Sequence, residues 1–305
     1  MSEEEEKKRI EEGENFIDWC ICLYLNKVKK YLDEGKDINY FSKTRKCNGL
    51  ISTLEYHSSG VAIEIAILLL NSNKCELNMK GSWGRTVLHF LGMSTFSLDT
   101  FELFKKIIHM NGIDLNIQDD DGRSLLMILS SSYSNSFDIE AIKLLINDKR
   151  CDLNLEDNEG RTALMLLSKN FDTPFEIIVL FLKNERCDLN LKNKKGRTAL
   201  WYACMYNCDD YVMKFLLNCG NRLVIDQSIE YPRNQDIIDN CIAKQRNKIG
   251  TLLIFVKKEP KINTHEKRQS NELEENPLKI IPNELIHLIL SYSYPLVPQT
   301  KYCLN

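Results

Sequence analysis

The chain has 305 residues, of which 43% are apolar and 27% are charged, proportions typical of globular proteins. Its formal net charge of −3 argues against a general nucleic-acid binder, because such proteins concentrate excess basic charge on one face. The acidic start Ser2–Glu6 does not resemble a secretory signal, and the longest apolar stretch, Val61–Leu70, is too short to span a bilayer. We therefore expect a protein of the cytoplasm or nucleus with no nucleic-acid or membrane partner.

Two elements precede the repetitive part of the chain. Residues 1–13 are rich in glutamate and are predicted to form an acidic tail. Residues 14–38 contain the apolar residues of a helical segment between Phe16 and Leu32. This segment leads into Gly35-Lys-Asp-Ile-Asn39, a motif that recurs in altered form further along the chain.

A four-residue motif then recurs at regular spacing. It stands at Cys75-Glu-Leu-Asn78, Ile113-Asp-Leu-Asn116, Cys151-Asp-Leu-Asn154 and Cys187-Asp-Leu-Asn190. Each asparagine is followed six residues later by a glycine, and these glycines are 38, 38 and 36 residues apart. They are Gly84, Gly122, Gly160 and Gly196. Self-similarity of this period indicates a repeat architecture in which each repeat packs on its neighbours.

The residues after each glycine predict how a repeat folds. Glycine permits a tight backbone turn, and the Arg-Thr or Arg-Ser that follows supplies a preferred helix N-cap. In the third repeat, the first helix is therefore expected at 163–168. A polar loop leads to a second helix, in which Phe175, Ile178, Val179 and Leu182 have helical spacing.

This pattern resembles the ankyrin repeat, whose Asn-x-x-Asp-x-x-Gly motif precedes Thr-Pro-Leu-His. The motif stands intact at Asn116/Asp119/Gly122 and Asn154/Asp157/Gly160, and substituted at Asn78/Gly81/Gly84 and Asn190/Asn193/Gly196. The proline of the family is missing from all four repeats, and only His89 retains the histidine. The resemblance implies an all-α solenoid of helix–turn–helix repeats with β-turn fingers, a monomer whose function is to bind a target protein.

The resemblance also implies the boundaries of an array at residues 14–256. Residues 14–38 would form an N-terminal cap, and residues 39–77 a degenerate repeat with helices near 50–56 and 61–70. The four clear repeats would occupy residues 78–115, 116–153, 154–189 and 190–220. Residues 221–256 lack the motif and are predicted to form an irregular cap, which a solenoid needs to shield its last core face.

Two further elements follow the array. Residues 257–276 are polar and highly charged, so they are predicted to be a linker. Residues 277–305 open with a proline-containing segment in which Pro282 suits the first turn of a helix. Apolar residues with helical spacing follow, among them Leu285, Leu288 and Ile289.

This tail resembles the opening of an F-box, and related modules such as PRANC end ankyrin proteins of large DNA viruses. The resemblance implies a viral protein in the host cytoplasm, whose tail docks onto the Skp-type adaptor of a cullin–RING ubiquitin ligase while its repeats select the target. The implied docking residues are Ile281, Pro282, Leu285, Ile286, Leu288 and Ile289. Only 29 residues remain from Pro277, fewer than a full F-box. The alternative is a helix that folds back to cap the array, which would leave a plain ankyrin binding protein.

No catalytic or metal-binding constellation is recognisable in the sequence. Phosphate-loop, zinc-protease and nucleophile-elbow motifs are absent, and the eleven cysteines form no CxxC pair. We therefore expect no enzyme activity, no cofactor and no metal. The cysteines, including Cys75, Cys151 and Cys187, are expected to be reduced and mostly packed. At the position of the family's histidine, His89 is expected to have a structural hydrogen-bonding role.

A row of arginines forms the first set of candidate partner contacts. One arginine follows the turn glycine of each clear repeat: Arg85, Arg123, Arg161 and Arg197. One interpretation is a solvated row that pairs with acidic residues of the neighbouring turns. The other is a track for an extended acidic segment of a partner, because the guanidinium group suits carboxylates. The sequence leaves both open.

The turn tips change charge along the array. Asp120, Asp121 and Glu159 make two tips acidic, whereas Lys194 and Lys195 make another basic. Such a gradient would orient a partner of mixed charge, although ordinary surface chemistry would produce the same pattern.

Three large side chains complete the candidate contacts. Trp83 is predicted to be exposed at a turn tip, and Met205 with Tyr206 ends a first helix where ankyrin proteins often contact ligands. Exposed residues of this kind are common binding anchors, and local packing is the alternative. Trp201, in contrast, is expected in the core.

Overall fold

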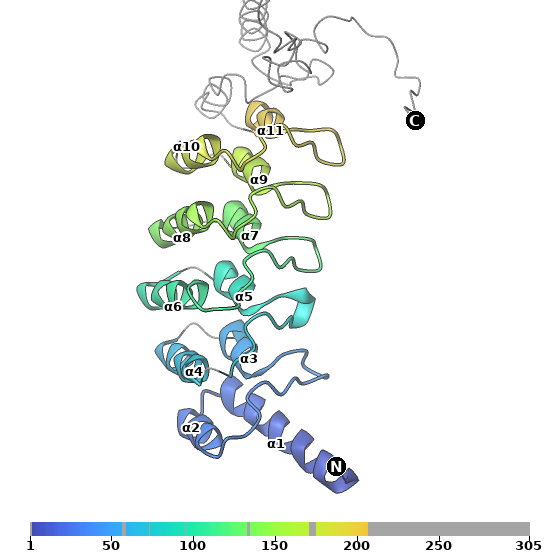
Figure 1. Ribbon diagram of the computed structural model, residues 1–305, viewed down its shortest axis with the longest axis vertical. Coiled ribbons are helices and arrows are strands. Elements are labelled where there is room, and N and C mark those ends of the chain that lie inside the picture. The colour runs from blue at the N-terminus through green and yellow to red at the C-terminus, as the bar shows by residue number, and fades with distance from the viewer. Residues whose placement is uncertain are drawn as a thin grey trace, which may run out of the picture. The chain divides into compact units, whose positions relative to one another are not determined.

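A computed structural model describes residues 2–56, 59–72, 74–94, 96–132, 135–170 and 175–206. The chain divides into two compact units, residues 1–233 and 234–305, and all described residues lie in the first. These residues form α-helices, a short 3-10 helix η1 (Ser82–Gly84) and loops, and the extended pairings among them are isolated bridges rather than a sheet (Figure 1). Within the same ranges, the helices are too short or too polar to cross a bilayer.

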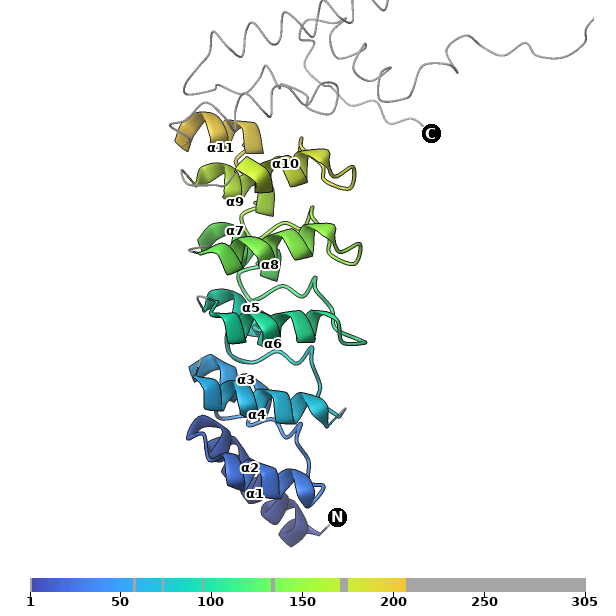
Figure 2. The ribbon, with the colours of Figure 1, turned by 90° about the vertical axis from the view of Figure 1, so that its left-hand side faces the viewer.

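The helices alternate between two layers along the chain. The first layer contains α1 (Glu3–Ile21), α3 (Gly49–Tyr56), α5 (Val87–Met93), α7 (Leu125–Ser132), α9 (Ala163–Lys169) and α11 (Ala199–Tyr206). The second contains α2 (Leu25–Asp33), α4 (Gly60–Asn71), α6 (Leu98–Ile108), α8 (Ser136–Asn147) and α10 (Phe175–Lys183). Each helix packs against the next helix of its own layer, so that helix pairs stack (Figure 2).

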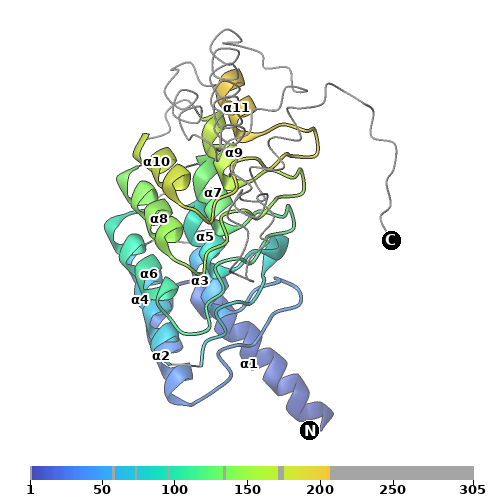
Figure 3. The same cartoon turned by 45° about the horizontal axis from the view of Figure 1, so that its top comes forward.

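The chain between a second-layer helix and the next first-layer helix projects to one side of the stack, to the right in Figure 1. We call the six-residue turns in these projections fingers 1 to 5. They comprise residues 42–47, 80–85, 118–123, 156–161 and 192–197. Figure 3 shows the second-layer helices, the first-layer helices and the fingers as three adjacent rows.

The first helices of the clear repeats begin where the sequence predicts. The Thr162 hydroxyl accepts a hydrogen bond from Met165 N at 3.4 Å, and α9 starts at the next residue, Ala163. The Thr198 hydroxyl caps α11 in the same way, accepting from Trp201 N at 3.3 Å. Each cap satisfies a backbone donor that the first helical turn would otherwise leave unpaired in a buried position.

The asparagine that ends each copy of the four-residue motif bonds to the chain at the next copy of that motif. Asn116 Nδ2 donates to the carbonyl of Arg150 at 2.8 Å, and Asn116 Oδ1 accepts from Asp152 N at 2.7 Å. Equivalent pairs of hydrogen bonds are made by Asn39, Asn78 and Asn154. The asparagine amide therefore pairs one backbone N–H group and one backbone carbonyl at the next copy of the motif.

Apolar side chains at equivalent helix positions fill the space between the layers. Leu88, Leu126, Leu164 and Leu200 are each 1–2% exposed, and burying one leucine stabilises the fold by about 1.5–3 kcal/mol. Close approach of successive first-layer helices also requires small residues, since a β-carbon on Gly92 would lie 2.6 Å from Leu125 Cδ1. The core is thus continuous along the stack.

Finger 1, in the segment predicted to be a degenerate repeat, folds without the turn glycine. Lys46 occupies the equivalent position with a φ of 52°, a left-handed conformation that is uncommon for residues other than glycine. Ser42 N donates to Cys47 O at 2.9 Å and closes the turn. α3 and α4 follow.

The N-terminus differs from the predicted acidic tail at residues 1–13, because most of that segment belongs to α1. Ser2 and Glu5 form a reciprocal capping box, in which the Ser2 hydroxyl accepts from Glu5 N and the Glu5 carboxylate accepts from Ser2 N. Acidic residues in a first helical turn are stabilised by the helix dipole. The ring of Tyr40 packs on Gly13 and leaves no room for a β-carbon, which anchors this part of the helix.

The turn glycines generate a testable prediction about stability. Gly122 has a φ of 75°, and a β-carbon there would lie 2.7 Å from Asn158 N of finger 4. Gly122→Ala should therefore lower the free energy of unfolding by more than the roughly 1–2 kcal/mol of left-handed strain alone. Chemical denaturation of the full chain measures the loss.

Two matched substitutions separate strain from contact. Gly112 has a φ of 82° but no atom of the described residues within 4 Å of a β-carbon, so Gly112→Ala should show the strain alone. Gly60 begins α4 and likewise has open space, so Gly60→Ala should be neutral or stabilising. Equal losses for Gly122→Ala and Gly112→Ala would contradict a contribution from the finger contact.

Candidate protein-binding face

The finger tips form a row that backbone hydrogen bonds hold together. Asp120 N donates to Trp83 O at 2.9 Å, Asn158 N to Asp121 O at 3.0 Å, and Lys194 N to Glu159 O at 3.0 Å. Each bond joins one finger to the next, and the turn glycines allow this close approach. We call the resulting row of tips, from finger 2 to finger 5, the finger edge.

In fingers 3 and 4 the arginines are paired within their own turn. Arg123 lies 3.1 Å from the Asp119 carboxylate and 2.7 Å from that of Asp121. In finger 4, Arg161 contacts Asp157 at 2.7 Å and Glu159 at 3.2 Å. Burial disfavours the charge of Arg161, but the hydrogen bond to Asp157 together with the charges of Asp157 and Glu159 outweighs it, and the pKa of Arg161 lies above its usual value.

The carboxylates that pair with these arginines also close the turns. Asp119 Oδ1 accepts from Asp121 N at 3.0 Å and from Arg123 N at 2.8 Å, and the Asp157 carboxylate makes the equivalent bonds. Both side chains are 1% exposed. The aspartate four residues before the arginine therefore has a structural and an electrostatic role.

Finger 2 lacks this aspartate, and its arginine has a different environment. Gly81 occupies the position, and Arg85 Nε lies 3.8 Å from Asp119 Oδ2 of the next finger. Among the described residues, the buried Arg85 Nε has no hydrogen-bond partner. Nearby, the half-buried Glu55 has a pKa raised by burial, which the charge of Arg85 partly offsets.

Finger 5 has Asn193 in place of the aspartate. Asn193 Oδ1 accepts from the backbone N–H groups of Lys195 and Arg197, each at 2.9 Å, and its Nδ2 donates to the hydroxyl of Tyr202 at 2.9 Å. The Arg197 guanidinium lies 3.9 Å from the centre of the Trp201 ring, a cation–π geometry. Arg123 and Arg161 are thus paired with carboxylates of their own turns. Arg85 lies near a carboxylate of the next finger, and Arg197 lies against the ring of Trp201.

Trp83 is the most exposed large apolar residue of this face. Its side chain is 70% exposed, as the sequence predicts, and its backbone has a φ of 61°. A bulky residue in the left-handed region is rare. Met205 is 38% exposed, while Trp201 is 8% exposed, which confirms that it belongs to the core.

Tyr206 packs within an aromatic group at the end of α11. Its ring stacks on Tyr202 with centroids 6.1 Å apart, and Lys169 Nζ lies 5.5 Å from the ring centre. Sequence reasoning missed Tyr56 and Met93, which end α3 and α5 and are 56% and 49% exposed. Their place at helix ends was visible in the sequence, but their exposure depends on packing.

His89 and the repeat cysteines have the structural environments expected of them. His89 is buried, its Nδ1 accepts from Thr86 N at 3.2 Å, and its Nε2 therefore carries the proton that it donates to Arg123 O at 3.1 Å. Cys151 is buried and free, and burial raises the pKa of its thiol to about 12. Among the described residues, no group of potential metal ligands comes together.

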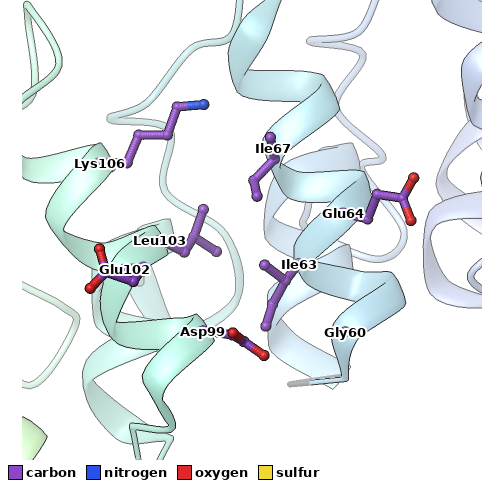
Figure 4. Close-up of a pocket in the computed structure, with 8 residues that line it drawn as sticks. All are labelled: Gly60, Ile63, Glu64, Ile67, Asp99, Glu102, Leu103 and Lys106. Carbon is purple, nitrogen blue, oxygen red and sulfur yellow. The ribbon is translucent and has the colours of Figure 1, made fainter.

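A shallow groove of about 360 Å³ separates α4 from α6 on the second layer. Ile63, Ile67 and Leu103 point toward one another across it (Figure 4). Two charged residues that line the groove already have partners within the array: Glu64 pairs with Lys29 at 3.2 Å, and Lys106 Nζ donates a hydrogen bond to Asn71 at 2.6 Å. This groove therefore offers a ligand little unpaired charge.

Several predictions from the sequence lie outside the described residues. They are the irregular cap at 221–256, the linker at 257–276 and the docking residues of the tail between Ile281 and Ile289.

Comparisons with known proteins identify the repeats. Residues 91–177 match the family model for ankyrin repeats in three copies, and residues 195–225 match that for a single ankyrin repeat. No curated protein matches the sequence.

Solved structures are similar in fold. An ankyrin repeat domain from Acinetobacter baumannii is 19% identical with a TM-score of 0.55, and the match covers 68% of this chain and 97% of that one. A further ankyrin repeat protein is 21% identical with a TM-score of 0.54, covering 67% and 96%. The family matches and this similarity confirm the predicted all-α ankyrin solenoid.

The environment of His89 predicts a pH dependence of stability. Burial lowers the pKa of His89 below its usual 6.5, although the hydrogen bond to Arg123 works in the opposite direction. The unfolded chain therefore binds a proton at this residue more readily than the folded chain. The contribution of His89 is fully present above about pH 6.5 and decreases as the pH falls below that value.

This dependence is measured by denaturation at pH 7.5 and pH 5.5. The parent chain should lose more stability between the two than His89→Gln, which has no titrating group at this position. Because the other four histidines are common to both proteins, the difference isolates His89. An identical loss in both proteins would show that His89 titrates normally.

Proposed function

We propose that this chain, whose residues 91–177 and 195–225 are ankyrin repeats, is a non-enzymatic protein-binding module that holds a partner along the finger edge. Ankyrin repeats generally mediate protein–protein interaction, and the chain-specific observation that supports the proposal is Trp83. This side chain is 70% exposed on a backbone with a φ of 61°. Both features are unfavourable for the free protein. Burial against a partner would remove the exposure, and backbone strain of this kind is concentrated at functional sites.

The construction of the finger edge suits a binding surface. The turns of fingers 3 to 5 are closed by carboxylate or amide acceptors, and a backbone hydrogen bond joins each finger of the edge to the next. Such a surface loses little conformational freedom when a partner binds, so more of the contact energy is retained as affinity. The tip side chains, in contrast, are free to differ from finger to finger.

Site-specific photo-cross-linking in cells that express the full chain tests this proposal. A photoreactive residue in place of Trp83 or Met205 should yield a discrete cross-linked protein. The same residue in place of Leu98, which is 59% exposed on the second layer, should not. Equal cross-linking from all three positions would contradict a partner on the finger edge.

A substitution at Trp83 should separate stability from binding. Asparagine tolerates the left-handed region far better than a bulky residue, so Trp83→Asn should leave the free energy of unfolding unchanged or raise it. Loss of an interface anchor should at the same time lower the affinity for the cross-linked partner by about 2 kcal/mol. The control, Leu98→Asn, should leave that affinity unchanged.

We further propose that residues 277–305 link the array to a cullin–RING ubiquitin ligase through its Skp-type adaptor. The support is the resemblance of Pro282, Leu285, Leu288 and Ile289 to the opening of an F-box. A chain that acts in this way would work in the cytoplasm or nucleus. The alternative remains a tail helix that caps the array.

Paired charge substitutions in the tail distinguish the two roles. Leu285→Asp with Ile289→Asp should abolish co-purification of the adaptor and leave the melting temperature unchanged if the tail is a ligase-docking element. His287→Asp with Ser291→Asp, which has the same spacing on a different face of the predicted helix, should retain the adaptor. A lower melting temperature for the first pair, with no adaptor bound by the parent, would establish the cap.

A further inference from the structure

Finger 5 reverses the charge of fingers 3 and 4 without a change of turn. Residues 156–161 contain three carboxylates and one arginine, and so do residues 118–123, whereas residues 192–197 contain three lysines and one arginine. The backbone is the same in both cases. Asp157 N donates to Arg161 O at 3.0 Å and Asn193 N to Arg197 O at 2.9 Å, and the glycines have φ values of 74° and 72°.

Asn193 retains the structural role of the aspartate and removes its charge. Its Oδ1 accepts the same two backbone N–H groups that the Asp157 carboxylate accepts in finger 4. Its Nδ2 then donates to the Tyr202 hydroxyl, so the amide is satisfied without an ion pair. Arg161 has two carboxylate partners, but Arg197 contacts none among the described residues.

The Arg197 side chain is held in place by the Trp201 ring beneath it. A guanidinium that stacks at 3.9 Å from a ring centre uses its face for the aromatic contact and leaves its N–H groups free to bind a carboxylate at the edge. Lys194 and Lys195 are exposed in the same turn and form no ion pair with a described residue. With Lys192, four cationic residues thus share one finger.

We infer that finger 5 binds a short acidic segment of the partner protein through Arg197, Lys194 and Lys195. The inference rests on the proposed function and names the chemistry of the partner at one end of the finger edge. Carboxylates of the segment bind the edge of the Arg197 guanidinium and the two ammonium groups. Met205, 38% exposed, supplies an apolar contact on the helix that follows the finger.

The neighbouring fingers restrict the ligand to a protein segment rather than a nucleic acid. Finger 4 is joined to finger 5 by the bond from Lys194 N to Glu159 O, and finger 3 beyond it presents exposed Asp120 and Asp121. A long polyanion that crossed these tips would face like charges at close range, which costs affinity. A short run of carboxylates, followed by neutral or basic residues, avoids this repulsion.

Fluorescence anisotropy with the full chain tests the site. The probe is a fluorescein-labelled peptide that carries a block of glutamates in a glycine–serine background, and the comparison probes are the same peptide with lysines and a short oligo-dT strand. The glutamate peptide should bind, with an affinity that decreases as salt is added. The inference is overturned if the oligonucleotide or the lysine peptide binds as tightly as the glutamate peptide.

The decisive variant is Asn193→Asp, which gives finger 5 the carboxylate of fingers 3 and 4. It should preserve the fold, since aspartate closes those turns, and weaken binding of the glutamate peptide about ten-fold by pairing with Arg197. Asp157→Asn is the converse change in finger 4 and should leave binding equal or tighter. Unchanged affinity in Asn193→Asp, with circular dichroism equal to the parent, would refute the inference.

A charge-matched control addresses general electrostatics. Lys194→Ala with Lys195→Ala should weaken peptide binding, whereas Lys149→Ala with Lys183→Ala, which removes the same charge outside the fingers, should not. Equal effects of the two pairs would overturn the site. Cross-links at residues 83 and 205 without peptide binding would refute this inference alone, and peptide binding without cross-links would instead refute the proposed function.

Discussion

The stack depends on a side-chain amide that donates and accepts at once. Asn154 donates to the carbonyl of Arg186 and accepts from the N–H of Asp188, each at 2.7 Å, and thereby pairs two backbone groups at the next copy of the four-residue motif. A carboxylate at this position would only accept, and an apolar residue would do neither. Unpaired backbone groups cost more than the bonds themselves contribute, so this amide fixes the position of each repeat on the next.

Once the repeats are in register, the fingers follow. Each tip comes close enough for one backbone bond to its neighbour, as between Asn158 N and Asp121 O, and a β-carbon at Gly122 would prevent it. These bonds use the main chain alone and do not depend on which side chain stands at the tip, although Asn158 adds a side-chain bond from its Nδ2 to Asp120 O at 2.9 Å. This separation lets charge vary from finger to finger at little cost in stability, which a binding surface requires.

The parts of the fold that depend on local backbone chemistry were predictable from the sequence. The Asn, Asp and Gly spacing and the Thr or Ser after each arginine determine turns and helix starts, and α9 begins at Ala163 as expected. The acidic tail predicted at residues 1–13 is instead helical from Glu3 onward, because the charge run hid the Ser2–Glu5 capping box. Exposure of Tyr56 and Met93 was not predictable, since it depends on what packs beside each helix end.

The row of arginines shows where sequence reasoning stops and why. As residues they are equivalent, but Arg123 and Arg161 pair with carboxylates of their own turns rather than of neighbouring turns, whereas Arg197 contacts no carboxylate among the described residues. What decides between these two arrangements is the residue four positions earlier: an aspartate keeps the arginine within its own turn, and the amide of Asn193 closes the same turn while leaving Arg197 to stack on Trp201. Because both residues accept the same backbone N–H groups, a single change between them alters the charge presented at a finger without altering its shape. The charge that a finger presents is therefore set by a residue beneath the surface that a partner would touch. As whole residues, Asp157 and Asn193 are only 5% and 6% exposed.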